Sequence, residues 1–182
     1  MLSTRKLVYA ALFAAVTAAL GLIMIPIHPV PVTGQSMGPM LAGSILGSRT
    51  GALSLIVFDL LAAAGVPVLS GGRGGLGIIL GPTGGYILSW PIAAYVIGKI
   101  VECRQKRTIP LYIIANIVGG IAVVYAVGVL WLSVQQGLDI KTAFLEGALI
   151  FIPGDMVKVF AASIAAKSVS RVFNVRQRGD YK

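Results

Sequence analysis

The feature that most constrains this chain is the length of its stretches without charged side chains. Residues 7–48 contain no Asp, Glu, Lys or Arg over 42 positions, and residues 74–98 and 108–138 give further stretches of 25 and 31. A helix that crosses the hydrocarbon core of a bilayer needs roughly 20 apolar residues. The composition, 57% hydrophobic and 12% charged, is also far from that of a water-soluble domain. We therefore expect residues 1–182 to form a single membrane domain in the lipid bilayer.

The basic residues predict how the chain crosses the membrane. Twelve of the 15 lie in four places, namely the N-terminus, the turn at 48–50, the loop at 99–107 and the C-terminal tail. The positive-inside rule puts all four on the cytoplasmic side, which also explains the net charge of +9 without nucleic acid. Only an even number of spans joins successive cytoplasmic segments. We expect an all-α protein with six transmembrane helices and both termini cytoplasmic, with approximate spans 7–25, 34–47, 50–66, 86–101, 109–134 and 152–172.

Two segments on the expected outer side carry polar chemistry. Eight of the 15 residues from 71 to 85 are glycine, and the only charge among them is Arg73. Glycine lets the backbone approach a ligand closely. In the last span, a start at Ile152 places Pro153 in the first helical turn, where proline is tolerated. The segment at 142–150 is then an outer interfacial segment.

This start also places Asp155 and Lys158, at i and i+3, on one helix face near the outer surface. Ionisable residues at membrane depth are rare and costly, so the pair indicates a binding site. The alternative is an internal ion pair that fixes helix packing. For Arg73 the alternative is a solvated loop tip. Asp59, near the middle of the third span, has no role that the sequence assigns.

The first span carries alanines every four residues. Ala10, Ala14 and Ala18 form one ladder, and Ala11, Ala15 and Ala19 form a second. Small residues at this spacing let two membrane helices approach closely. The residues alone leave open whether the close neighbour is another helix of this chain or a partner protein.

Enzymatic motifs are missing from the sequence. Residues 72–77 satisfy G-x-G-x-x-G, but no strand precedes them and no acidic residue follows at the required distance. There is no P-loop, and the lone His28 has no companion ligands for a metal. No catalytic set of Ser, His and Asp is present. We expect neither catalysis nor a bound metal or cofactor.

Five motifs give the chain a resemblance that covers nearly its whole length. They are residues 29–35 (PVPVTGQ), 66–75 (VPVLSGGRGG), 81–86 (GPTGGY), 128–132 (GVLWL) and 151–158 (FIPGDMVK). In these motifs the chain resembles the BioY family, the biotin-specific substrate-binding (S) components of energy-coupling factor (ECF) transporters. Two positions depart from the family pattern as we expect it. Gly34 stands in place of a bulkier aliphatic residue, and Asp59 in place of an apolar or aromatic one.

The resemblance implies a multi-pass protein of the prokaryotic plasma membrane that captures biotin with high affinity for uptake. It implies three partners, a transmembrane T component and two cytoplasmic ATPase subunits that hydrolyse ATP. It also implies that the ladder of Ala10, Ala14 and Ala18 docks on the T component. An S component for a different vitamin is the alternative. A membrane-embedded enzyme or channel would need a catalytic set or polar lining that the sequence does not contain.

Biotin offers two ureido N–H donors, a ureido carbonyl, an apolar sulfur ring and a carboxylate. We expect Gln35 and Asp155 to accept from the ureido N–H groups, and backbone N–H groups of the glycine loop to donate to the ureido oxygen. We expect Lys158 or Arg73 to neutralise the carboxylate, and the aromatic residues to cover the rings and tail. The expected biotin-binding residues are Gln35, Gly72, Arg73, Gly74, Gly75, Tyr86, Tyr125, Trp131, Asp155 and Lys158.

Overall fold

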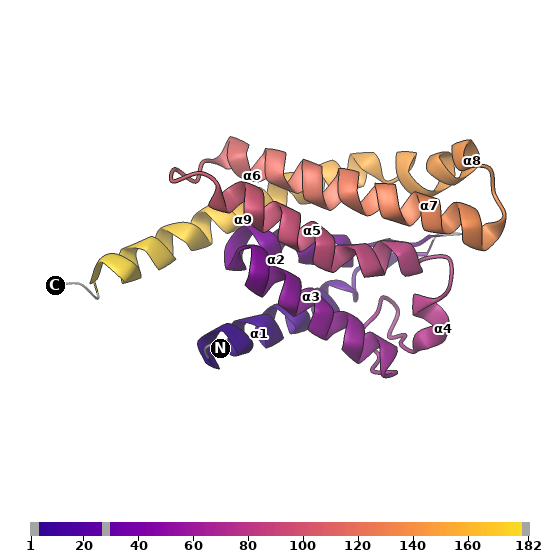
Figure 1. The fold of residues 1–182 in the computed structure, drawn as a ribbon, viewed down its shortest axis with the longest axis horizontal. Coiled ribbons are helices and arrows are strands. Elements are labelled where there is room, and N and C mark those ends of the chain that lie inside the picture. Colours follow the sequence, from indigo (N-terminus) through magenta and orange to yellow (C-terminus); the bar gives the residue numbers. More distant parts are fainter. Residues whose placement is uncertain (1–3, 27–29, 180–182) are drawn as a thin grey trace.

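The chain folds into a bundle of helices that run roughly along its long axis (Figure 1). The computed structural model describes the backbone of residues 4–26 and 30–179 and the side chains as far as residue 170; His28 and Pro29 lie outside the described residues. The elements are α1 (Thr4–Leu20), β1 (Met24–Ile25), β2 (Val32–Thr33), η1 (Gly34–Ser36), α2 (Met37–Leu46), α3 (Ser48–Ala63), α4 (Leu76–Ile79), α5 (Gly84–Glu102), α6 (Ile109–Asn116), the π-helical η2 (Ile117–Val123), α7 (Val124–Gln136), α8 (Ile140–Phe144), the π-helical η3 (Leu145–Leu149) and α9 (Ile152–Gly179).

The all-α expectation needs one correction, at the end of the first predicted span. The first helix ends at Leu20 and not at residue 25, and Met24–Ile25 pairs antiparallel with Val32–Thr33. Proline explains the change, because a residue that precedes proline favours an extended backbone. Ile25 precedes Pro26 in just this way. A short two-stranded ribbon therefore lies between α1 and η1.

Two helices of the described chain are long and apolar enough to cross a membrane. They are Gly84–Glu102 and the continuous helix Ile109–Gln136. Ile140–Leu149 and Ile152–Ser170 pass the same test together, with a bend of 45° between them. The helices α1, α2 and α3 are 17, 10 and 16 residues long. Six spans therefore remain a prediction, while two or three candidate spans are present.

The last helix begins at Ile152, as the position of Pro153 predicts. The preceding segment, expected at 142–150 as an outer interfacial segment, is helical and has an exposed apolar face, and its interfacial position stays a prediction. It forms α8 and η3, whose Ala143, Gly147 and Ala148 are buried inside the protein. Small residues make this burial possible, since they let the segment pack closely against α7.

The basic clusters gather at one end of the molecule, where Figure 1 also draws both termini. The backbone N–H and the hydroxyl of Ser48 each donate to the Glu102 carboxylate at 2.8 Å, so the α2–α3 turn is fixed to the end of α5. Lys167 Nζ donates to the backbone oxygen of Arg107 at 2.5 Å. The connections at 21–26, 30–36, 64–83 and 137–151 lie at the opposite end.

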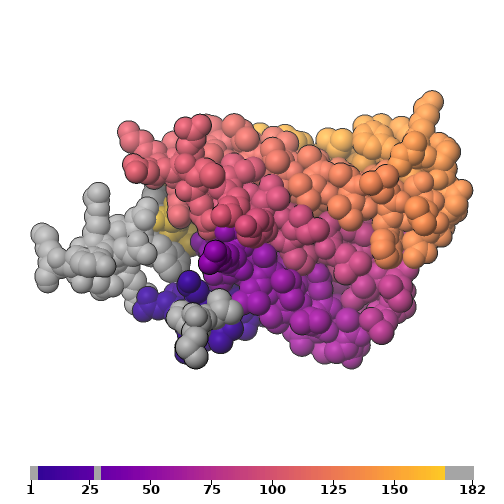
Figure 2. Space-filling view, viewed as in Figure 1, coloured from indigo at the N-terminus to yellow at the C-terminus, as the bar shows by residue number. Residues whose placement is uncertain are grey.

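Buried contacts hold the helices together along their length. One apolar cluster centres on α3, α5 and α7, and a second joins α2, α5, α6 and α9. The surfaces of α3 and α5 adjoin in the space-filling view (Figure 2). A buried polar chain also crosses the bundle, because Ser44 Oγ donates to Asn116 Oδ1 and Asn116 Nδ2 donates to Ser163 Oγ, each at 3.1 Å.

The alanine ladder chosen for docking faces the inside of the protein. Ala10 and Ala14 are only 1% and 3% exposed, and Ala18 is partly buried. The first ladder is thus an internal seam, because α1 packs this face against α2 and α3. The second ladder, Ala11, Ala15 and Ala19, is exposed. The assignment of Ala10, Ala14 and Ala18 to a partner surface is therefore corrected.

Candidate ligand-binding site

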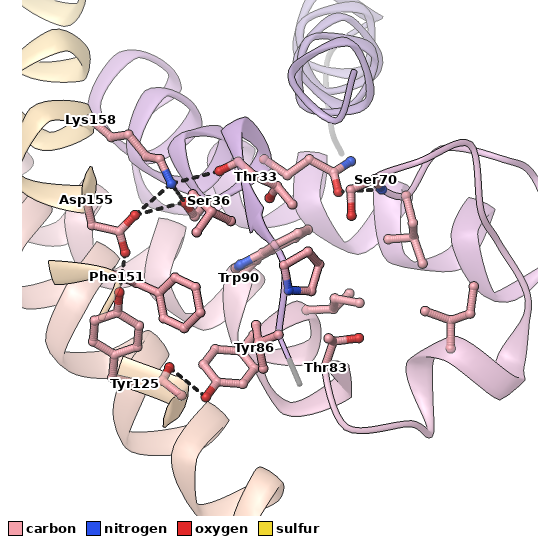
Figure 3. Close-up of a pocket in the computed structure, with 18 of the residues that line it drawn as sticks. Thr33, Ser36, Ser70, Thr83, Tyr86, Trp90, Tyr125, Phe151, Asp155 and Lys158 are labelled. Carbon is pink, nitrogen blue, oxygen red and sulfur yellow. Dashed lines mark hydrogen bonds and ion pairs between the residues drawn. The ribbon is translucent and has the colours of Figure 1, made fainter. Parts of the chain in front are cut away.

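A cavity opens at the end of the bundle opposite the basic clusters (Figure 3). It encloses about 650 Å³ of space not filled by atoms, its mouth included. Four segments distant in sequence supply its wall: the stretch from 30 to 36, the loop before α4, the start of α5, and the α7–α9 region. The lining residues are Val30, Pro31, Val32, Thr33, Gln35, Ser36, Leu69, Ser70, Arg73, Ile78, Thr83, Tyr86, Ile87, Trp90, Tyr125, Gly147, Phe151, Asp155 and Lys158.

A charged pair lies at one side of this cavity. Lys158 Nζ is 2.7 Å from Asp155 Oδ1, and Asp155 is only 4% exposed. The same ammonium group donates to the backbone oxygen of Thr33 at 2.7 Å and to Ser36 Oγ at 2.8 Å. All three ammonium protons therefore have acceptors, and α9 is tied to β2 and η1.

The carboxylate of Asp155 is also well supplied with donors. Besides Lys158, it accepts from Ser36 Oγ at 3.3 Å and from the hydroxyl of Tyr125 on its other oxygen. A carboxylate has about four lone-pair positions, so one remains for a further donor. Since both members of the pair border the cavity, holding the fold and contacting a ligand are compatible roles.

Aromatic side chains form much of the remaining wall. Tyr86 and Tyr125 meet edge to face, with ring centroids 6.4 Å apart, and the Tyr86 hydroxyl donates to the backbone oxygen of Gly147 at 2.8 Å. Trp90 and Phe151 also line the cavity. The sequence analysis did not select these last two. A signal was available for Trp90, which lies four residues after Tyr86 and thus on the same helix face.

Trp131 is not among the residues that line the cavity. Its indole N–H donates to the backbone oxygen of Gly81 at 2.8 Å, and its side chain packs against Gly85. The residue therefore fastens the 81–85 turn to α7. The expectation that Trp131 covers a ligand is corrected, because the close approach at Gly85 turns the indole away from the cavity.

The glycine loop serves the fold and not the cavity wall. Gly72, Gly74 and Gly75 do not line the cavity. The N–H groups of Gly72 and Gly75 donate to the backbone oxygens of Leu69 and Ala62, at 3.0 and 2.7 Å. Both glycines have positive φ values, 67° and 102°, which other residues rarely adopt. The expected donation to a ligand is therefore corrected for Gly72 and Gly75, whose N–H groups already donate within the fold.

What the loop delivers to the cavity is Arg73 and Ser70. Arg73 Nε donates to the backbone oxygen of Ser70 at 3.0 Å, so the side chain folds back over its own loop. The N–H of Arg73 is used within the loop, donating to Leu69 O at 3.2 Å. Arg73 therefore borders the cavity while remaining exposed, so it stands both at the cavity wall and at the surface of the loop.

Gln35 lines the cavity but has both ends of its amide occupied. Its Nε2 donates to the backbone oxygens of Val68 at 2.7 Å and Thr17 at 3.3 Å, while Oε1 accepts from the Ser70 N–H at 2.9 Å. The residue is 1% exposed. Gln35 therefore braces residues 68–70 of the loop against α1. Its oxygen accepts one hydrogen bond and has a second lone pair, so donation from a ligand N–H to this oxygen stays a prediction.

Asp59 does not line the cavity. It lies half-buried on α3, and its Oδ1 is buried without a hydrogen-bond partner among the described residues. Nothing in the structure assigns it a function.

Comparisons with known proteins agree with one another. The family model that describes the BioY family matches residues 1–175. A protein named biotin transporter BioY from Rhizobium etli is 43% identical over 177 residues, covering 92% of this chain and 94% of that protein. A protein of the same name from Rhodobacter capsulatus is 43% identical over 180 residues, with the same two coverages. A crystal structure of the S-component for biotin from an ECF-type ABC transporter superposes with a TM-score of 0.87 at 33% identity, covering 94% of this chain and 95% of that one.

The role of Gln35 as a brace predicts the effect of replacing it. Gln35→Met keeps the length of the side chain but leaves the Ser70 N–H and the Val68 oxygen without partners. Each buried unsatisfied group costs about 1–3 kcal/mol, so we expect a lower free energy of unfolding and faster hydrogen exchange at 68–70. Gln136→Met at the exposed end of α7 is the matched control, with little expected change. Unchanged exchange at 68–70 in Gln35→Met would show that Gln35 is no brace.

Proposed function

This chain is a member of the BioY family, and from that premise we propose that it binds biotin as the substrate-binding component of an ECF transporter. The observation that carries the proposal is one cavity bordered by the Asp155–Lys158 pair, by Arg73 and by aromatic side chains. Small-molecule sites are typically apolar pockets with a few placed polar groups. Biotin, with an apolar ring system between a ureido group and a carboxylate, has the complementary chemistry.

Electrostatics favours one orientation of the ligand. Lys158 is already neutralised by Asp155 at 2.7 Å, and a second carboxylate beside Asp155 would be repelled where the dielectric constant is low. Arg73 has no carboxylate partner among the described residues. We therefore place the biotin carboxylate at Arg73. The ureido ring then lies at the Asp155–Lys158 pair, where its N–H groups can reach the open position on the carboxylate.

The orientation predicts how the ligand carboxylate contributes to binding. Purified protein should bind biotin tightly, and thiamine and riboflavin weakly or not at all. Biotin amide should bind about tenfold or more weakly, because it loses a charge-assisted hydrogen bond. In Arg73→Gln the affinities for biotin and biotin amide should converge, while Lys141→Gln, outside the cavity, should leave the difference intact. Titration calorimetry measures all four ligands. A full preference for the acid in Arg73→Gln would place the carboxylate elsewhere.

ATP-driven transport by this chain would draw on partner subunits, because the sequence contains no P-loop of its own. We propose that it works with a transmembrane T component and two cytoplasmic ATPase subunits. In this arrangement the basic end of the bundle faces the cytoplasm of the plasma membrane and the cavity faces outward. For docking on the T component we propose the exposed ladder Ala11, Ala15 and Ala19, since small residues allow close helix approach.

The two alanine ladders predict opposite outcomes for the same substitution. Ala15→Trp should fold and bind biotin like the parent in detergent, yet abolish uptake in cells that contain the partner subunits, because bulk blocks the helix contact. Ala14→Trp should lower the thermal stability of the purified protein, because Ala14 is buried against the chain's own helices. Uptake by Ala15→Trp at the parental rate would exclude this face as the docking surface.

A further inference from the structure

One buried polar atom of the cavity wall has no partner. Trp90 is 5% exposed, and its ring packs against Phe58 with centroids 5.8 Å apart. Its Nε1 is buried and has no hydrogen-bond acceptor among the described residues. Three other buried side-chain atoms share this condition, on Ser54, Asp59 and Tyr112, but none of those residues lines the cavity.

An unpartnered indole N–H at this place is unusual. Buried Trp N–H groups usually find an acceptor, and a buried donor without one costs about 1–3 kcal/mol. Trp131 of the same chain follows the rule, since it donates to Gly81. The wall around Trp90 otherwise has its buried donors occupied, including the Tyr86 and Tyr125 hydroxyls and the Gln35 amide. An acceptor atom of a bound ligand would give the Trp90 N–H the hydrogen-bond partner that it lacks.

The position of the indole indicates which ligand atom that is. In Figure 3 the nitrogen end of Trp90 is drawn toward the side of the cavity where Asp155 and Lys158 lie. The orientation proposed above puts the ureido ring on this side and the carboxylate at Arg73. The ureido group has a single acceptor oxygen, and an indole N–H is a donor only.

We propose that Trp90 donates its indole N–H to the ureido carbonyl oxygen of bound biotin and is thereby a specificity-determining residue of the site. The inference rests on the proposed function. Trp90 lies outside the five motifs of the sequence analysis. In this proposal it is the residue that recognises the ureido oxygen, the neutral hydrogen-bond acceptor of the ligand. A ligand with a donor at that point would face the indole N–H and be rejected.

The test pairs Trp90→Phe with two ligands, biotin and 2-iminobiotin, by titration calorimetry at neutral pH. Phenylalanine keeps an aromatic ring in the cavity but has no donor. In 2-iminobiotin a protonated guanidine replaces the ureido group, so the acceptor oxygen becomes a donor. We expect Trp90→Phe to weaken biotin binding about tenfold, because the ureido oxygen loses its partner. The same variant should bind 2-iminobiotin as well as, or better than, the parent.

Thermal unfolding without ligand supplies a second readout and a matched control. Trp90→Phe should lose less stability than Trp131→Phe, because both variants shrink an aromatic side chain but only Trp131→Phe also breaks a hydrogen bond, the one to Gly81. Trp131→Phe should retain the parental preference for biotin over 2-iminobiotin.

Each other outcome overturns the inference. Parental biotin affinity in Trp90→Phe would show that the indole N–H meets no ligand atom. An equal loss for biotin and 2-iminobiotin would show that the ring contributes by packing alone. If the parent itself does not bind biotin, the proposed function fails, which is a distinct result from a parent that binds and a variant that binds equally.

Discussion

A buried charge must be neutralised and hydrogen-bonded where it lies, and in this protein that requirement organises the cavity end of the bundle. Lys158 reaches Asp155, Ser36 and the Thr33 backbone, while Asp155 also holds the hydroxyl of Tyr125. One pair of charges therefore joins α9 to the segment after α1 and to α7. Removing one partner of such a pair costs about 3–5 kcal/mol, so these three elements are fixed together around the cavity.

The glycine loop positions a cation, Arg73, at the cavity wall while N–H groups of its backbone are hydrogen-bonded within the protein. Leu69 and Ala62 accept N–H groups of the loop, and Gln35 ties residues 68–70 to α1. The loop thereby closes on itself and leaves the guanidinium of Arg73 at the cavity. Polar groups at both sides of an apolar space then distinguish the two ends of an elongated ligand.

Local features of the sequence predicted where α9 begins and which of its charged residues meet. Contacts between residues distant in sequence determine which faces of the helices point inward. The start of α9 follows from Pro153, and the Asp155–Lys158 contact follows from their spacing on one helix. The sequence does not tell which of two alanine ladders faces inward, since a rotation of α1 about its axis exchanges them. Nor does it tell that Trp90 faces the cavity and Trp131 does not, because the rotations of α5 and α7 are set where Gly85 meets Trp131 and Gly128 meets Tyr86. The rotation of each helix about its axis depends on contacts between residues distant in sequence, so it could be known only from the structure.

We conclude that the Asp155–Lys158 pair serves the ligand as well as the fold. A double-mutant cycle distinguishes the two roles, with Asp155→Asn, Lys158→Met and the double variant each assayed for thermal stability and biotin affinity. Each single change should weaken biotin binding at least about tenfold, and the double variant, even where its stability recovers, should not recover binding. A double variant that binds biotin like the parent would show that the pair has a structural role only.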